Sequence, residues 1–238
     1  EAQNTVMMVD VGTNTEVVVG NSNKMMAASC PAGPAFEGGD ITYGMPGYDG
    51  AVESVAIDDD SVSIKTIGGA DPVGICGSGL VDLLSELRRT GQMNELGVFK
   101  DGAREIFFDS ENRMSVSRSD VSALAQAKSA NYCGQKIVLR SYGVTPRDID
   151  RLYLAGGFAN YVDVENAKNI GFIANVPKNR VTKVGNAALE GGTIMLISAE
   201  QRMLAENMVT GIEHVELETT PDFFEIFVDG CHFNPMEN

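Results

Sequence analysis

Two short apolar runs on either side of a glycine turn constrain the fold of this chain more than any other feature. They lie in the stretch MMVDVGTNTEVVVG, residues 7–20. Short apolar runs rich in valine and methionine are typical of strands that are buried on both faces. We therefore predict strands at 5–9 and 16–20, and a third strand at 24–29 completes a meander.

Patterns typical of helices and of further strands alternate along the rest of the chain. Leucines at helical spacing predict an amphipathic helix within 74–91 that ends at Gly91, and Ser119 is predicted to cap a long helix that ends at Gly143. The acidic run at 58–60 is predicted to form a solvated hairpin turn. Further strands are predicted at 105–108, 114–117, 152–155 and 181–184, and further helices from near Asp163 and from Ala187 to Met208.

This order of elements predicts the fold class and the domain organisation. A meander followed by helix and strand alternation indicates an α/β fold with a mixed sheet covered by helices. Residues 45–118 are expected to form a smaller inserted α+β subdomain. Residues 1–44 and 119–238 are expected to form the main subdomain around the sheet.

Composition limits the partners and the compartment of the chain. At 238 residues and 43% hydrophobic content, it can bury a sizeable core. A net charge of −15 without a Lys/Arg cluster argues against nucleic acid as a partner. The four cysteines form no C-x-x-C pair, so we expect buried, reduced thiols in a cytoplasmic protein and no zinc or iron–sulfur site. No apolar stretch approaches the roughly 20 residues that cross a bilayer, and no membrane contact is expected.

Three glycine turns, at 12–15, 156–158 and 185–186, each follow a predicted strand. Ligands of α/β sheets bind at strand ends, where glycine lets backbone N–H groups approach an anion. Threonine hydroxyls in the first turn can donate to phosphate, and Asp10 is suited to hold a hydrated Mg²⁺. A magnesium–nucleotide site is the functional interpretation; a plain hairpin turn and close helix packing are the structural alternative. Neither a G-x-G-x-x-G nor a P-loop motif occurs.

Five blocks in order resemble a known family. They read VDVGTNTEVVVG, ASCPAGPAFEGGDITYGM, IGGADPVGICGSGLVDLL, LYLAGGFANYVD and KVGNAALEGG. Together they are similar to the C-terminal part of the reductive activators of corrinoid proteins, members of the acetate and sugar kinase, heat-shock cognate and actin superfamily. The resemblance implies a ribonuclease-H-like sheet, which is one of two halves that face each other across an ATP cleft.

The resemblance also implies roles for individual residues. DVGTNTE, 10–16, matches the second phosphate loop, AGGFA, 155–159, the adenosine motif, and GNAAL, 185–189, the second connecting helix. Asp10 is then the catalytic acid near Mg²⁺, and Glu16 is a second acid whose side chain is expected to point away because it adjoins Thr15. The implied nucleotide-binding residues are Gly12, Thr13, Asn14 and Thr15 at the phosphates, Gly156, Gly157 and Phe158 at the adenosine, and Gly185 and Asn186 in the third turn.

By this resemblance, the expected function is ATP-driven reactivation of a corrinoid protein, with its cobalt reduced from +2 to +1. The family's first half and its ferredoxin-like domain, which carries a two-iron two-sulfur cluster, have no counterpart in these 238 residues. The chain begins with Glu1 directly before a predicted strand, so we expect a longer protein to continue upstream. The corrinoid protein and that upstream half are the expected partners, and a homodimer is left open.

Two alternatives remain at the level of sequence. The chain could be a non-catalytic docking or dimerisation module, or a small-molecule kinase of the same superfamily. Two further residues carry predictions: Cys76 is expected to be a buried structural thiol, and Lys128 is expected on a solvated face of the long helix.

Overall fold

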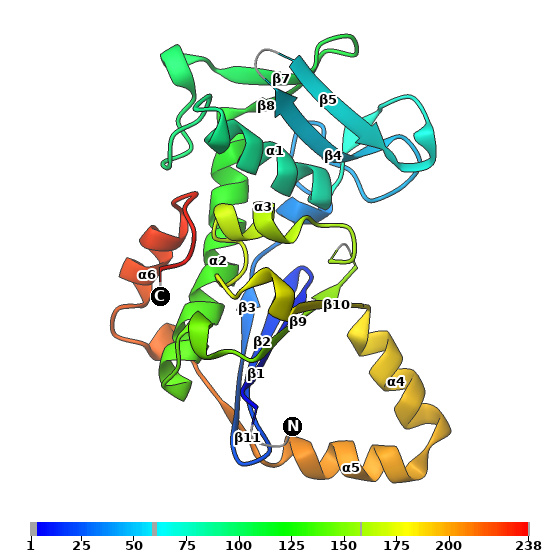
Figure 1. The fold of residues 1–238 in the computed structure, drawn as a ribbon, viewed down its shortest axis with the longest axis vertical. Coiled ribbons are helices and arrows are strands. Elements are labelled where there is room, and N and C mark those ends of the chain that lie inside the picture. Colours follow the sequence, from blue (N-terminus) through cyan, green and yellow to red (C-terminus); the bar gives the residue numbers. More distant parts are fainter. Residues whose placement is uncertain (1–3, 59–60, 158, 238) are drawn as a thin grey trace.

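The computed structural model describes residues 4–58, 61–157 and 159–237, and a six-stranded mixed sheet forms its centre. The strand order is β10-β9-β1-β2-β3-β11 (Figure 1). The meander of β1, β2 and β3 is antiparallel, whereas β9, β10 and β11 join in parallel. The bounds are β1 (Val6–Val11), β2 (Asn14–Gly20), β3 (Met25–Pro31), β9 (Arg151–Gly156), β10 (Val181–Gly185) and β11 (Ile212–His214). The predicted α/β fold with a mixed sheet is confirmed.

The two faces of this sheet differ in burial. Met7, Val9 and Val17 are fully buried on one face. Their chain neighbours Met8 and Val18 point to the other face, because side chains alternate along a strand, and are only half-buried. Helix α2 (Arg118–Tyr142) packs across the buried face, against β2 and β3 (Figure 1).

Helix α2 begins two residues earlier than its predicted cap implies. Its N-cap is Ser117 rather than Ser119, so that prediction is wrong. Asp120 stands three positions after Ser117, and the two residues cap each other, with the backbone N–H of Ser117 donating to the Asp120 carboxylate at 2.9 Å. The predicted end at Gly143 is confirmed, because this glycine adopts a φ of 89°.

A smaller set of strands lies beyond one end of the main sheet (Figure 1). The predicted hairpins are confirmed as strands, although the acidic turn includes residues 59–60, which lie outside the described residues. The subdomain boundaries stay a prediction. The elements are β4 (Ala51–Asp58), β5 (Ser61–Thr66) and β6 (Gly74–Ile75) in one sheet, α1 (Gly77–Arg89), and the hairpin of β7 (Glu105–Asp109) and β8 (Met114–Ser117).

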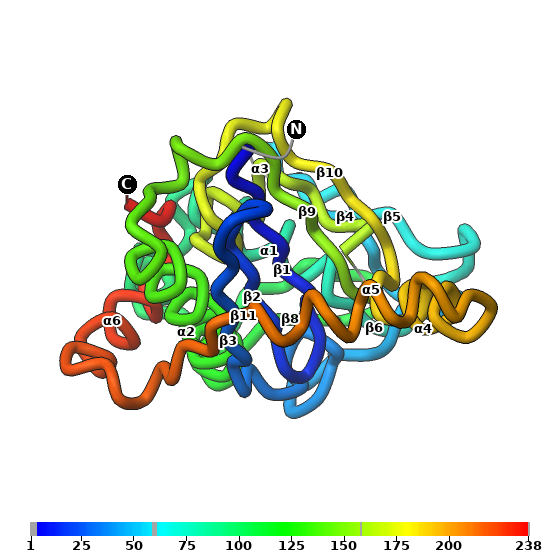
Figure 2. The backbone as a smooth tube through the Cα atoms, turned by 90° about the horizontal axis from the view of Figure 1, so that it is seen from below, coloured from blue at the N-terminus to red at the C-terminus, as the bar shows by residue number. Residues whose placement is uncertain are grey.

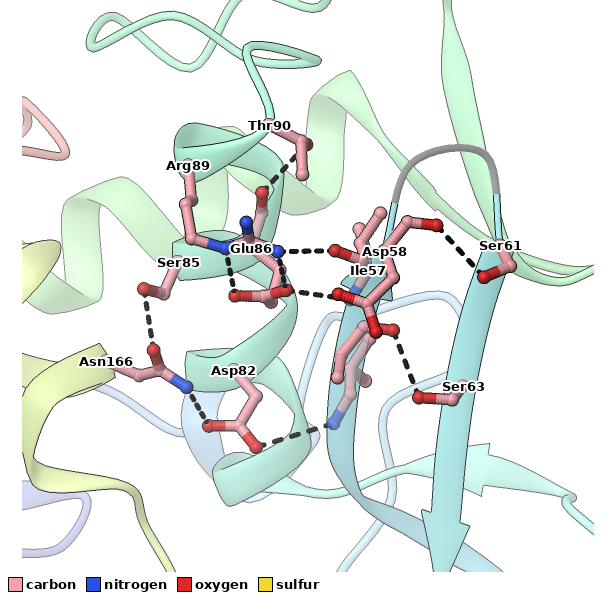
Figure 3. Close-up of polar contacts among 12 residues, drawn as sticks. Ile57, Asp58, Ser61, Ser63, Asp82, Ser85, Glu86, Arg89, Thr90 and Asn166 are labelled. Carbon is pink, nitrogen blue, oxygen red and sulfur yellow. Dashed lines mark hydrogen bonds and ion pairs between the residues drawn. The ribbon is translucent and has the colours of Figure 1, made fainter.

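A polar network connects α1 to the elements on either side of it (Figure 3). On one side, Glu86 accepts hydrogen bonds from the Ile57 N–H at 2.7 Å and from Arg89 Nε at 2.8 Å. The Arg89 hydrogen bonds hold the pKa of Glu86 below its ordinary value. On the other side, Asp82 accepts from Asn166 Nδ2 at 2.7 Å, on α3 (Val164–Asn169). Helix α1 is thus held between the small sheet and α3.

The region predicted as one helix from 187 to 208 is two helices, α4 (Ala187–Ile197) and α5 (Ala199–Val209). The prediction is wrong at Ser198, which is extended and whose Oγ accepts from the Gln201 N–H at 3.2 Å, so that it caps α5. Two later elements were not predicted: β11, which has only three residues, and α6 (Phe223–Gly230), which packs on α2.

Lys128 contradicts its predicted solvated position. Its side chain is fully buried, and its Nζ donates to the carbonyl oxygens of Gly230 and, at 2.9 Å, His232. Burial lowers the pKa of this ammonium group to about 7. Through these two hydrogen bonds, Lys128 holds the C-terminal residues 230–232 against α2.

Two composition-based predictions concern thiols and membranes. Cys30, Cys76 and Cys133 are buried and Cys231 is half-buried, which confirms the mostly buried thiols. Among the described residues, none of the helices has both the length and the apolar content that crossing a bilayer requires.

Candidate functional site

The structure brings the three glycine turns together at one edge of the main sheet. Strands β1, β9 and β10 are adjacent and parallel, so their carboxyl ends meet there. Val11 lies opposite Gly156, and Ala155 lies opposite Gly185. Gly12 follows β1 directly, so one turn from each strand contributes to a single surface.

Two of these glycines are required by the backbone. Gly156 has a φ of 114°, and a Cβ atom on it would lie 2.1 Å from the carbonyl oxygen of Val11. Gly185 has a φ of 66°. Asn186 follows it and accepts the Leu189 N–H at 2.9 Å, which caps α4. Close packing of the strands and capping of α4 therefore require these turns, whether or not a ligand binds beside them.

Asp10 and Glu16 form a pair of facing carboxylates. They are direct cross-strand partners on β1 and β2, so both side chains lie on the half-buried face of the sheet. Burial first, and the facing Glu16 second, raise the pKa of Asp10. The expectation that Glu16 points away is wrong, because pairing within the hairpin, rather than its position next to Thr15, fixes its direction. Ser29 Oγ donates to Glu16 at 3.0 Å.

The residues of the first turn have different surroundings. Thr13 is exposed, and its hydroxyl donates to both carboxylate oxygens of Glu37 at 2.8 Å. The carbonyl oxygen of Asn14 accepts the Gly12 N–H at 3.0 Å and closes the turn. Thr15 is fully buried on the opposite face from Glu16, and its hydroxyl has no hydrogen-bond partner within the described part of the chain.

A cavity of about 560 Å³ opens beside these turns. Gly12 and Gly157 line it from the sheet, and Cys76, Gly77 and Ser78 line it from the start of α1. The first N–H groups of a helix have no partner within that helix and favour an anion. The start of α1 therefore offers backbone donors to the cavity, whereas the N–H of Gly12 is already bonded to Asn14, and the other lining residues include the acids Glu37 and Glu53.

Sequence reasoning missed the contribution of α1. The segment GICGSG was assigned only to the beginning of the helix predicted within 74–91, although its glycines were a signal for close approach. Residues 76–78 and Gly157 are distant in the sequence and line the same cavity only in the folded chain. Phe158, which the resemblance assigns to the adenosine, lies outside the described residues.

Asp10 and Glu16, which adjoin the first turn but are not among the residues that line the cavity, suit a magnesium ion whose other ligands are water and substrate phosphates. No cluster of three or more His, Cys, Asp or Glu side chains that could enclose a metal occurs among residues 4–58, 61–157 and 159–237. Mg²⁺ usually takes one or two carboxylates and completes its shell with water and substrate phosphates. The Asp10 and Glu16 pair provides that smaller set, and a cation there would relieve the repulsion between them.

A mixed sheet with glycine turns at the carboxyl ends of three neighbouring strands is the arrangement of the acetate and sugar kinase, heat-shock cognate and actin superfamily. A family model described as the C-terminal domain of RACo, the ASKHA domain, matches residues 4–238. The chain belongs to this family, which confirms the resemblance found in the sequence.

Individual relatives agree with this assignment. Over 251 residues the chain is 33% identical to a protein named corrinoid activation enzyme RamQ from Eubacterium limosum, covering 95% of this chain and 42% of that protein. It is 24% identical over 205 residues to a Co(II) methylated amine-specific corrinoid protein reductase from Methanosarcina barkeri, covering 77% of this chain and 37% of that protein. A solved structure named reductive activator for corrinoid,iron-sulfur protein superposes with a TM-score of 0.89 and 30% identity, covering 99% of this chain and 40% of that one. The chain thus spans about two fifths of the relatives that it matches.

Proposed function

We propose that this chain is the ATP-binding part of a reductive activator, which drives the cobalt of a corrinoid protein from the +2 to the +1 state. The observation that carries this proposal is the convergence of three glycine turns beside the facing Asp10 and Glu16 carboxylates. The names of the relatives supply the corrinoid partner. ATP and Mg²⁺ are the proposed ligands.

The residues of the site have distinct proposed roles. Asp10 and Glu16 hold Mg²⁺ on the nucleotide phosphates, and the ion neutralises charge that these carboxylates would otherwise repel. Gly12 and Gly157 carry no side chain and let the phosphates and the nucleoside come close to the backbone, while the first N–H groups of α1 face the phosphates. Thr13 exchanges its hydrogen bond to Glu37 for one to a phosphate oxygen. Gly156, Gly185 and Asn186 maintain the backbone conformation of the turns.

The remaining parts of the proposed activator lie outside this chain. An upstream half forms the other side of the cleft, and the inserted subdomain 45–118 contributes the wall around α1. The electron comes from a two-iron two-sulfur cluster on an N-terminal domain. ATP binding brings the halves together around the corrinoid protein, in the cytoplasm.

The proposal is tested by calorimetric titration of Mg·ATP into the chain and into an Asp10→Ala variant. We expect binding to weaken by at least roughly tenfold in the variant, because the ion loses a carboxylate ligand. Glu111→Ala is the matched control: it removes the same charge from the exposed turn between β7 and β8.

Two outcomes would count against the proposal. Equal affinity in the parent chain and in Asp10→Ala would place the nucleotide elsewhere. A chain that binds no nucleotide, alone or within the longer activator, would favour the docking module. Phosphoryl transfer from ATP to a small acceptor in a substrate screen would instead favour the kinase alternative.

A further inference from the structure

The segment that follows α6, residues 231–236, is packed against elements of both predicted subdomains. We call it the clasp. Figures 1 and 2 both show this red segment beside the green helix α2. The clasp forms neither helix nor strand, yet its side chains Phe233 and Met236 are only 1% exposed. It is therefore a built part of the fold, and its contacts indicate what it holds together.

On the side of the main sheet, α2 and the turn after α3 hold the clasp. Lys128 of α2 donates to two carbonyl oxygens at the start of the clasp, one of them that of His232 at 2.9 Å. Its Nζ also lies 5.6 Å from the centre of the Phe233 ring, an attractive cation–π contact. The turn after α3 approaches so closely that a Cβ atom on Gly171 would collide with the carbonyl oxygen of Asn234. The clasp is therefore fixed to the main subdomain.

On the other side, the clasp is bonded to the predicted subdomain 45–118. Arg88 of α1 donates from Nε to the carbonyl oxygen of Phe233 and from Nη2 to Asn234 Oδ1, both at 2.9 Å. Its Nη1 donates to the carbonyl oxygen of Met93 at 3.2 Å. The N–H of Phe233 donates to the carbonyl oxygen of Glu95 at 2.8 Å. One short segment thus joins α1 and the loop after it to the main subdomain.

Helix α1 connects the clasp to the cavity beside the glycine turns. Its first residues, Gly77 and Ser78, line that cavity together with Gly12 and Gly157 of the main subdomain. Arg88, which binds the clasp, is the last residue of α1 but one. A helix of 13 residues is about 20 Å long, so the two contacts lie at opposite ends of one stiff element.

Between these two ends, α1 is bonded to α3 through a single side chain. Asn166 donates to Asp82 at 2.7 Å and accepts from Ser85 at 3.0 Å (Figure 3). Both partners stand near the middle of α1. A displacement of the clasp end about this contact is therefore transmitted to the cavity end, because the helix between them moves as a unit.

We propose that the clasp controls the release of nucleotide from the cavity through α1, an inference that rests on the proposed function. With the clasp bonded to Arg88, the start of α1 stays beside Gly12 and Gly157 and a bound nucleotide is retained. When those bonds open, α1 turns about its contact with Asn166 and the cavity widens. The coupling is reciprocal, so a bound nucleotide also stabilises the clasp.

The test is the rate at which the magnesium complex of a fluorescent ATP analogue, N-methylanthraniloyl-ATP, dissociates from the chain and from the longer activator. We expect Arg88→Ala to raise this rate by roughly tenfold, because three hydrogen bonds are lost. Asn234→Asp should lower it by roughly threefold, since a carboxylate accepts more strongly from a guanidinium than an amide does. The control is Arg89→Ala, which should leave the rate unchanged. It removes the same charge from the neighbouring residue, whose hydrogen bonds go to Glu86 and Ile57 and not to the clasp.

Amide hydrogen exchange gives a second readout that requires no nucleotide. In the ligand-free chain, the amides of α1 should exchange faster in Arg88→Ala than in Arg89→Ala, while those of α2 exchange equally. The proposal is overturned by a dissociation rate that Arg88→Ala leaves unchanged or that both arginine variants raise alike. Equal exchange of α1 in the two variants would also overturn it. Absence of nucleotide binding in the parent chain and in the activator would instead contradict the proposed function, and with it any control of release.

Discussion

At the scale of single residues, the Asp10 and Glu16 pair shows how a site can oppose stability. The two carboxylates face each other across β1 and β2, and the pKa of Asp10 is raised. We predict that Asp10→Asn raises the melting temperature without magnesium by about 2 °C, because it removes this repulsion. The same change should weaken Mg·ATP binding. Thermal unfolding with and without Mg·ATP measures both effects, and a lower melting temperature in the ligand-free variant would contradict the first.

Lys128 makes a second prediction, on the dependence of stability on pH. Its pKa is about 7 in the folded chain against an ordinary value of 10.5, so between these values the unfolded chain binds more protons. The contribution of Lys128 to the free energy of unfolding is therefore lowest below pH 7. It rises towards pH 10.5, by up to about 1.4 kcal/mol per pH unit. In Lys128→Met this contribution is absent. Urea unfolding across the pH range should show the parent chain gaining stability relative to the variant; parallel curves would contradict the low pKa.

At the scale of elements, the polar network around α1 should determine how firmly the small sheet is held. Asn166 donates to the nearly buried Asp82 and accepts from Ser85 Oγ at 3.0 Å. We predict that Asn166→Ala lowers the free energy of unfolding by about 1–3 kcal/mol, because a buried carboxylate loses a donor. Ser85→Ala should cost less, since its hydroxyl bonds a neutral amide. Denaturant titration measures both, and an equal cost would contradict the ranking.

The elements also show what the sequence could and could not predict. The meander, α1, β9 and β10 were predicted because apolar runs and glycine stops are local signals. The break at Ser198 was missed because no Gly or Pro marks it, and a serine cap depends on backbone geometry. The cap of α2 was placed on the wrong serine for the same reason. Lys128 was misplaced because its burial depends on the carbonyl groups of a segment about a hundred residues later.

The candidate site shows a similar limit. The glycine turns and Asp10 were predicted because the end of an apolar run and a neighbouring acid can be identified from the sequence alone. The direction of Glu16 required the register of the hairpin. The approach of residues 76–78 to Gly157 required the fold, because α1 belongs to a distant part of the sequence. Pairing within the sheet and long-range packing therefore supply what local patterns lack.

At the scale of the whole molecule, net charge predicts how the stability of the fold responds to salt. The chain carries a net charge of −15, with 33 acidic side chains against 18 basic ones. Excess carboxylates repel one another more strongly in the compact folded chain than in the expanded unfolded chain. Ion pairs such as Lys24 with Glu213 and Arg140 with Asp222 lie at exposed positions, and such pairs contribute about 1 kcal/mol or less. Repulsion should therefore dominate the electrostatic contribution to folding.

Raising the salt concentration from about 0.05 to 0.5 M shortens the screening length from more than 10 Å to less than 5 Å. We predict that the melting temperature of the chain then rises by roughly 2 °C or more, because the repulsion is screened and apolar burial is not weakened. Thermal unfolding followed by circular dichroism at the two salt concentrations measures this change. A lower melting temperature at high salt would mean that ion pairs dominate the electrostatic contribution to folding, which would contradict the prediction.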